Sequence, residues 1–368
     1  MGRFTSNVLP FGDMLLILGL SCAVALSAAN YPNLQEGDYA VGPYKFRSGE
    51  HLDSLKLHYT SIGNPVRDAS GVVRNAVLVL HGTGGTGHGF LERDYFHNEL
   101  FAPGQPLDAS KYYIILPDNV GHGKSSKPSD GLRLKFPHYG YLDMVDLQRK
   151  LLADKLGVKH LRLVVGTSMG CMHAWTWATE HTADIDAAMP LGCLPYPITG
   201  RNLLWRRMMI DLIQKDPNYH NGDYNGQIDA LRATRDIQFL MTQNTLDLQQ
   251  RGNTRADALK LFEHTQRAAS PLDANDLIYQ YDSSRDYDPN AKLELIQCPV
   301  VAINFADDPV NPPELGILER DIKRVKRGRA IVMPGTADTH GHGNHTYAAR
   351  WKQELVQLLE DSKSPIVN

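Results

Sequence analysis

The fold of this chain is decided by the stretch Leu161-Arg162-Leu163-Val164-Val165-Gly166-Thr167-Ser168-Met169-Gly170-Cys171-Met172-His173-Ala174-Trp175-Thr176-Trp177-Ala178. An apolar run of strand length leads into Gly-x-Ser-x-Gly, and a helix-like run follows directly. Small residues around Ser168 permit a sharp, strained turn in which the strand and the helix pass close together. Such a turn lifts the hydroxyl above a sheet and directs a helix N-terminus at it. The context therefore predicts Ser168 as a nucleophile rather than a chance match to the motif.

Short apolar runs alternate with longer helical stretches over most of the remaining chain. The predicted strands cover residues 55–60, 76–80, 112–116, 161–165, 187–191, 300–305 and 330–333. Near-continuous apolar strands separated by helices, such as the helix expected at 143–156, indicate a parallel sheet covered on both faces. The prediction is an α/β fold with a mostly parallel central sheet.

The strand–helix alternation stops in the segment 195–293. This segment is polar and is predicted to form helices at 201–214, 226–247, 255–268 and 272–281. A helical insertion after a strand is expected to form a lid over the carboxyl-terminal edge of the sheet, with a separate helical domain as the alternative. The predicted core then consists of residues 30–194 and 294–368.

The N-terminal 29 residues are expected to form a signal peptide. Arg3 precedes an apolar stretch at 14–29, and Ser27-Ala28-Ala29 places small residues before a cleavage site at Asn30. The alternative is an uncleaved anchor, but the apolar stretch is only 16 residues long, whereas a spanning helix needs about 20. We therefore expect an exported protein, periplasmic or secreted, without a stable membrane span after cleavage.

Composition narrows the possible partners and cofactors. A formal net charge of −3 gives no reason to expect nucleic acid as a partner. After signal removal, Cys171, Cys193 and Cys298 remain, and this odd number in apolar surroundings predicts buried free thiols. No Cys-x-x-Cys or His-Glu-x-x-His spacing is present, so neither a metal nor another cofactor is expected. The expected partner is a small-molecule acyl substrate, and a homodimer is left open.

A nucleophilic serine needs a base, and the base needs an orienting acid. The predicted strand 300–305 runs into Asp307 and Asp308, where an acid would lie at the functional edge of the sheet. Asp308 is favoured because it stands four residues before Pro312, a spacing frequent in hydrolases, and Asp307 is the alternate, expected otherwise to cap the following turn.

The base is expected after the last strand. Three histidines compete in the stretch 338–345, namely His340, His342 and His345. His342 is favoured because Gly341 before it lets the backbone turn toward the serine; His345 is the first alternate. A metal site built from the three is the weaker interpretation, because no second cluster of ligands accompanies them.

Glycines after the strand 76–80 predict a site for an oxyanion. His81-Gly82-Thr83-Gly84-Gly85-Thr86-Gly87 follows that strand, and the backbone N–H groups of Thr83 and Met169 are nominated as the oxyanion hole. A phosphate loop is excluded here because no Gly-Lys-Ser/Thr follows at the required spacing. The stretch 118–125 matches the Asp-x-x-Gly-x-Gly-x-Ser turn of hydrolases instead.

Together these residues resemble the α/β-hydrolase superfamily, and more specifically its homoserine O-acetyltransferase branch. The elbow at 166–172 and the segment 136–158 are similar to that branch, as is Asp216-Pro217-Asn218-Tyr219-His220-Asn221-Gly222-Asp223-Tyr224, which resembles its lid motif. The resemblance covers about residues 45–360. The loop at 81–85 departs from the His-Ala-Leu-Thr-Gly type of sequence usual in the transferases.

The resulting hypothesis is an exported serine hydrolase that cleaves an ester or a related acyl substrate through an acyl-serine intermediate. The first alternative is an O-acyltransferase of the homoserine O-acetyltransferase type that uses acetyl-CoA. A non-catalytic binding protein on the same fold is the third hypothesis.

Overall fold

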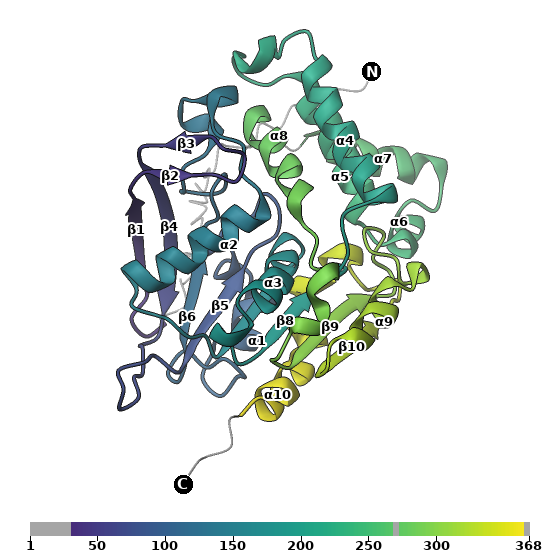
Figure 1. Ribbon diagram of the computed structural model, residues 1–368. Coiled ribbons are helices and arrows are strands. Elements are labelled where there is room, and N and C mark those ends of the chain that lie inside the picture. Colours follow the sequence, from purple (N-terminus) through teal and green to yellow (C-terminus); the bar gives the residue numbers. More distant parts are fainter. Residues whose placement is uncertain (1–30, 268–271, 364–368) are drawn as a thin grey trace, which may run out of the picture.

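The molecule is organised around one eight-stranded sheet, shown in Figure 1. The computed structural model describes residues 31–267 and 272–363, so the predicted signal peptide lies outside the described residues. Strand order is β1-β4-β6-β5-β7-β8-β9-β10, with β1 and β4 antiparallel to their neighbours and the other strands parallel. The strands are β1 (Gln35–Val41), β4 (Leu55–Ile62), β5 (Ala76–Leu80), β6 (Tyr113–Pro117), β7 (Leu163–Thr167), β8 (Ala188–Leu191), β9 (Val300–Phe305) and β10 (Gly328–Met333).

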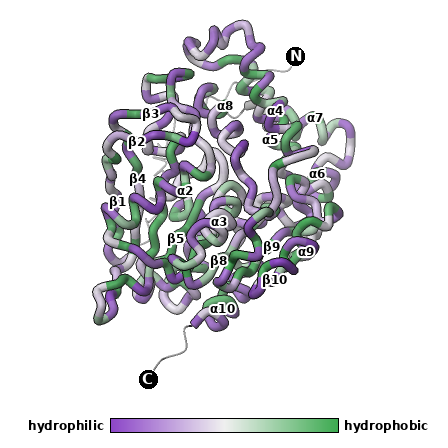
Figure 2. The backbone as a smooth tube through the Cα atoms, in the orientation of Figure 1, coloured by the Kyte–Doolittle hydropathy of each residue, from purple (hydrophilic) through white to green (hydrophobic). Residues whose placement is uncertain are grey.

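The central strands are buried on both faces because their side chains alternate between two hydrophobic cores. In β5, Leu78 and Leu80 face the core beneath α2 (Tyr141–Lys150) and α3 (Met169–Glu180). Val77 and Val79 face the opposite core, which α1 (Asp94–Leu100) and α10 (Lys352–Asp361) cover. In Figure 2 the central strands are accordingly coloured mainly as hydrophobic. The predicted α/β fold with a mostly parallel sheet is confirmed.

The predicted strands occur within two residues of their expected bounds, whereas β1 was not predicted. β1 is an edge strand whose residues are mostly exposed, so its sequence lacks an apolar run. The remaining small elements are the hairpin β2 (Tyr44–Lys45) and β3 (His51–Leu52), and α9 (Ile317–Asp321). The helix expected at 143–156 is α2 followed by a π-helical turn at Leu151–Lys155.

Five helices lie between β8 and β9, above the carboxyl ends of the parallel strands (Figure 1). They are α4 (Gly200–Lys215), α5 (Asp229–Thr242), α6 (Thr245–Arg251), α7 (Arg255–Arg267) and α8 (Ala274–Asp282). The single helix expected at 226–247 is broken, because Gln243 is extended and Asn244 caps α6 by accepting hydrogen bonds from the N–H groups of Leu246 and Asp247. We refer to α4–α8 as the lid.

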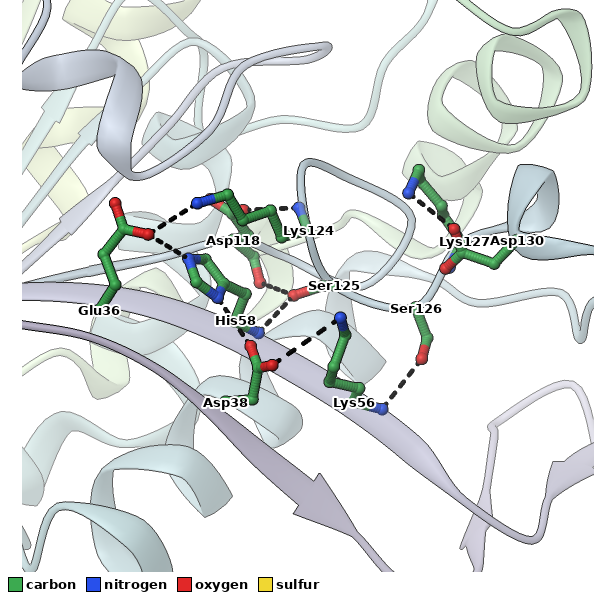
Figure 3. Close-up of polar contacts among 10 residues, drawn as sticks. All are labelled: Glu36, Asp38, Lys56, His58, Asp118, Lys124, Ser125, Ser126, Lys127 and Asp130. Atoms are coloured by element: carbon green, nitrogen blue, oxygen red, sulfur yellow. Dashed lines mark hydrogen bonds and ion pairs between the residues drawn. The ribbon is translucent and has the colours of Figure 1, made fainter.

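The turn after β6 is fixed by Asp118 and Ser125, as Figure 3 shows from the side of β1 and β4. The Ser125 hydroxyl donates to the carbonyl of Asp118 at 2.7 Å and accepts from the N–H of His58 at 2.8 Å. The Asp118 carboxylate accepts from the N–H groups of Lys124 and Gly87, at 2.8 and 2.7 Å. The predicted hydrolase-type turn therefore also holds the far end of the glycine-rich loop after β5.

Within residues 31–267 and 272–363, no helix combines the length and apolar character that crossing a membrane requires. The same part of the chain contains no group of three or more His, Cys, Asp or Glu side chains arranged to hold a metal ion.

Candidate active site

Ser168 occupies a strained turn between β7 and α3. Its φ is 54° and its ψ is −109°, a conformation that few residues other than glycine adopt. The turn is held by the Ser168 N–H, which donates to the carbonyl of Leu191 in β8 at 2.9 Å. The flanking glycines are required by close packing: a Cβ at Gly166 would lie 1.8 Å from the Gly170 carbonyl oxygen, and a Cβ at Gly170 would lie 2.1 Å from that of Leu80.

The structure brings Ser168, His342 and Asp308 into one hydrogen-bonded chain. Ser168 Oγ lies 2.8 Å from His342 Nε2, and His342 Nδ1 lies 2.9 Å from Asp308 Oδ2. The Asp308 carboxylate is fully buried and also accepts from the Val310 N–H and the Asn311 side-chain amide. With Nδ1 donating to this carboxylate, Nε2 is free to accept the serine proton, which is the arrangement that general-base activation of a serine requires.

Asp307 has a different environment from its neighbour. Its carboxylate accepts hydrogen bonds from the Thr339 hydroxyl at 2.6 Å, the Gly341 N–H at 2.8 Å and the Asn344 amide at 2.8 Å. It therefore fixes the loop that carries His342, and does not cap the turn that follows it as we expected.

The two other candidate histidines do not contact the serine hydroxyl. His345 packs edge-on against His342 with ring centroids 4.9 Å apart, and burial holds its pKa well below the ordinary value. His340 stacks on Tyr347 with a centroid distance of 3.6 Å. The structure thus brings His342 to the serine and places His345 behind it in the wall of the cavity.

The two nominated oxyanion donors belong to two different segments of the chain, the start of α3 and the loop after β5. Met169 is the first residue of α3, so its N–H has no acceptor one turn earlier in the helix. Thr83 lies in the loop after β5 and lines the same cavity as Ser168. Gly82, beside it, passes so close that an added Cβ would lie 3.2 Å from Ser168 Cβ. The loop therefore passes directly beside the nucleophile candidate, as an oxyanion hole contributed by this loop requires.

A buried network of hydrogen bonds, which the sequence did not reveal, connects this loop to α2 and α3. His81 Nδ1 lies 2.8 Å from the carbonyl of Gly82, and His81 Nε2 accepts from the N–H of Asn119 at 3.1 Å. The Asn119 side chain accepts from Gln148 in α2 at 2.6 Å, and Gln148 accepts from Trp177 in α3 at 2.7 Å. Burial lowers the pKa of His81, so the ring stays neutral and can both donate and accept. The signal in the sequence that could have revealed this network is a polar residue, Gln148, among the apolar positions of its helix.

A cavity of about 250 Å³ opens in front of Ser168. The core contributes the loop after β5, Arg93, Val310 and the histidine loop, while the lid contributes Arg206, Gln238, Met241, Thr242 and Tyr281. The lid therefore forms part of the wall around the nucleophile.

The lid motif at 216–224 organises the lid and is absent from the cavity wall. The Tyr219 hydroxyl donates to Asn275 at 2.7 Å, and the Tyr224 hydroxyl donates to Asp273 at 2.6 Å. The carboxylate of Asp216 accepts from the N–H of Ala230 at 2.9 Å, at the start of α5. These bonds tie the motif to α5 and α8, so its residues position the helices that do reach the cavity.

The cysteine prediction was wrong for two of the three thiols. Cys171 and Cys193 form a disulfide with a Cα–Cα distance of 5.9 Å, and Cys298 is a buried free cysteine. The pairing was hidden in the sequence because 22 residues separate the two cysteines, and only the fold brings the start of α3 to the end of β8. The disulfide therefore links the helix that begins directly after Ser168 to the segment that follows β8.

Comparison with known proteins identifies the family. Residues 75–335 match the model of the alpha/beta hydrolase fold family, so the chain belongs to that family. A probable acyltransferase from Methanothermobacter thermautotrophicus is 28% identical over 75% of this chain and 84% of that protein. A homoserine O-acetyltransferase from Haloarcula marismortui is 27% identical over 84% of this chain and 80% of that protein.

Solved structures give the same fold. The crystal structure of esterase E22 superposes with a TM-score of 0.75 at 18% identity, covering 89% of this chain and all of that chain. The protein is therefore an enzyme of the α/β-hydrolase fold that resembles the homoserine O-acetyltransferase branch. The two curated relatives are acyltransferases, and the esterase shares the fold.

Proposed function

We propose that the protein is an exported serine hydrolase that cleaves a small acyl ester. The observation that carries this proposal is the hydrogen-bonded chain Ser168–His342–Asp308 at the wall of a cavity. In the proposed reaction His342 Nε2 takes the serine proton as Ser168 Oγ attacks the ester carbonyl. The Thr83 and Met169 N–H groups then stabilise the oxyanion, and Asp308 orients the imidazole and stabilises its protonated form.

The second half of the reaction returns the enzyme to its starting state. His342 gives its proton to the leaving alcohol as the acyl-serine forms, and then takes a proton from water. Hydroxide attack on the acyl-serine forms the second tetrahedral intermediate, and its collapse releases a carboxylic acid while the proton returns to Ser168 Oγ. In a transferase, an alcohol such as homoserine would replace water at this step.

Two features favour water as the acceptor. The loop at 81–85 differs from that of the transferases, and an exported enzyme would lack cytosolic acetyl-CoA as a donor. The Cys171–Cys193 disulfide supports export, because structural disulfides persist in oxidising compartments and are rare in the cytosol. Transfer is favoured by the curated relatives and by the lid motif, so it is the second candidate.

The deciding experiment gives the mature enzyme short acyl esters in water, and in parallel acetyl-CoA with homoserine or serine. We expect free acid from the esters and no O-acetyl amino acid. Efficient formation of O-acetyl amino acid from acetyl-CoA would establish the transferase instead.

Export is tested separately by N-terminal sequencing of protein recovered from the cell envelope or medium. We expect a mature chain that begins near Asn30. A chain that begins at Met1 and is recovered from the cytosol would contradict the proposed export and remove the main argument against acetyl-CoA.

A further inference from the structure

Charge in the cavity points to a class of substrate. The cavity wall includes two arginines, Arg93 from the segment before α1 and Arg206 from α4 of the lid. No aspartate or glutamate of the described residues lines the same cavity. Its ionisable side chains are otherwise Tyr281 and the histidines His81, His342 and His345.

Arg206 is a buried cation without an acidic partner. Arg206 is only 5% exposed, and its side-chain partners among the described residues are Asn202, Ser284 and aromatic rings, none of them a carboxylate. Nε donates to the amide oxygen of Asn202 at 3.0 Å, and Nη1 donates to the Ser284 hydroxyl at 3.4 Å. The Tyr141 hydroxyl also interacts with this side chain, and like the other two acceptors it is neutral. The guanidinium, with its five donors, therefore has polar contacts but no anionic partner.

The aromatic neighbours of Arg206 do not supply the missing negative charge. The guanidinium lies 5.6 Å from the ring centroid of Tyr281, a cation–π distance. Burial raises the pKa of Tyr281 to about 12 and also raises that of Tyr141, so both phenols are neutral near pH 7. The nearby carboxylate of Asp286 is occupied by the N–H groups of Tyr141 and Leu142.

Arg93 adds a second cation on the core side. Its guanidinium has no hydrogen-bond or ion-pair partner in the part of the chain that the structure describes. Its side chain lines the cavity, and its positive charge adds to the effect of burial in lowering the pKa of both His81 and His345. Arg206 is buried and Arg93 is partly buried. A buried cation without a counter-ion is costly unless an anion binds beside it, and an arginine fork matches a carboxylate in geometry.

We propose that the substrate of this enzyme is a small ester that carries a free carboxylate, held by Arg206 and Arg93 while its acyl carbon lies at Ser168. The inference rests on the proposed function, whose nucleophile and cavity it shares. A cavity of about 250 Å³ suits a short-chain acid ester and is smaller than the range of about 300–1,000 Å³ typical of sites for drug-sized ligands. The carboxylate can belong to the acyl part or to the alcohol part of the ester.

The test uses matched substrates that differ only in charge. Monoethyl glutarate and its amide place the group on the acyl side, and 4-acetoxybutanoate and its amide place it on the alcohol side. We expect wild-type kcat/KM to be at least about tenfold higher for the acid than for the amide in one of the two pairs, as charge-assisted hydrogen bonds predict. The pair that shows the preference identifies the side that carries the carboxylate.

Two variants test the arginines, and a neighbour supplies the control. Arg206→Gln and Arg93→Gln should each reduce the acid-to-amide ratio by about tenfold. Arg207→Gln removes the same charge from the next, exposed position of α4 and should leave the ratio within about twofold of wild type. Equal ratios for acid and amide in both pairs, or equal effects of Arg206→Gln and Arg207→Gln, would overturn the inference.

A binding measurement separates this inference from the proposed hydrolysis. The Ser168→Ala variant should bind the preferred acid ester more tightly than its amide in calorimetry, and the added Arg206→Gln substitution should abolish the difference. This result with no turnover of any ester by wild type would support the carboxylate site and reject hydrolysis. Turnover of both members of each pair without any charge preference would support hydrolysis and reject the carboxylate site.

Discussion

Asp307 and Asp308 are neighbours in the sequence, yet their carboxylates serve different partners. Asp308 faces His342 Nδ1, whereas Asp307 accepts three hydrogen bonds from the loop 339–344. Sequence spacing and analogy favoured Asp308, but no local pattern could show what Asp307 does, because its partners come from a loop more than 30 residues later.

Variants at these positions should have distinct effects. Ser168→Ala and His342→Ala should each lower kcat by roughly 10⁴–10⁶-fold without unfolding the protein, and Asp308→Asn should cost less than Ser168→Ala. Ester hydrolysis assays with circular dichroism on each variant provide the measurement. An active His342→Ala variant beside an inactive His345→Ala variant would show that the base is His345.

Asp307 calls for a separate prediction, because its bonds are structural. Asp307→Ala should remove the acceptor of three loop hydrogen bonds and lower the free energy of unfolding by about 2–4 kcal/mol. Urea unfolding measures this, with the exposed Asp338→Ala in the same loop region as the control. Unchanged stability together with a loss of activity as large as that of Ser168→Ala would instead make Asp307 the orienting acid.

At the scale of elements, the disulfide ties the nucleophile helix to the neighbouring strand. It joins the start of α3 to the residue just beyond Gly192 at the end of β8. The helix that follows Ser168 is thus covalently linked to the strand whose Leu191 carbonyl accepts the Ser168 N–H. The sequence showed three cysteines in apolar surroundings but not their distances, which depend on how β7, α3 and β8 pack. That is why the prediction of free thiols failed.

Removal of the disulfide should destabilise the fold. For the Cys171→Ala/Cys193→Ala double variant we expect a loss of about 3 kcal/mol, from the chain entropy of a loop with a sequence separation of 22. Urea unfolding of the variant and of the oxidised wild type measures the loss. Alkylation of denatured, non-reduced wild-type protein should modify Cys298 and neither of the other two, and alkylation of all three would contradict the disulfide.

The lid and the histidine loop meet at Asn244. Its side-chain amide donates to the carbonyls of Thr336 and Thr339 at 2.6 and 2.8 Å, while its oxygen caps α6. The sequence predicted helices throughout this region but not the break, because the break depends on partners that the core supplies. The side chain of Asn244 thus links the position of the lid to the position of the loop that carries His342.

Considered as a whole, the molecule holds several histidines neutral in its interior. Burial lowers the pKa of His81, His122, His173 and His345, with that of His173 lowered to about 3. Below pH 6.5 these residues take up protons in the unfolded chain but not in the folded one. Burial raises the pKa of Asp276 to about 6 and also raises that of Asp143 and that of Asp286, and these three groups act in the opposite direction. Burial lowers the pKa of His181 and of His340 as well, so the affected histidines outnumber these aspartates.

Stability should therefore fall as the medium is acidified. The free energy of unfolding should be nearly constant from pH 8 to 7 and should then decrease, by up to about 1.4 kcal/mol per pH unit for each such histidine. Urea unfolding between pH 8 and 5.5 measures the slope, and His173→Gln should make it shallower. Constant or increasing stability on acidification would contradict neutral buried histidines.

The sequence predicted the overall architecture well because apolar strands and the glycine-flanked serine are local patterns. β5 and β9 have their expected bounds, and β7 leads into the predicted turn at Ser168. What it could not predict depends on distant contacts: the edge strand β1, the Cys171–Cys193 pair, and the place of Arg206 in the wall of the cavity at Ser168. The residues of the candidate site that belong to local motifs could be predicted from the sequence. Those that reach the site only through tertiary packing could not.

The central claim is that Ser168, activated by His342, is the nucleophile. The most direct measurement treats the mature protein with a fluorophosphonate and locates the modification by peptide mass spectrometry. We predict one phosphonylated residue, Ser168, with labelling abolished in Ser168→Ala and strongly slowed in His342→Ala. Labelling at another residue, or none on folded wild-type protein, would contradict the account.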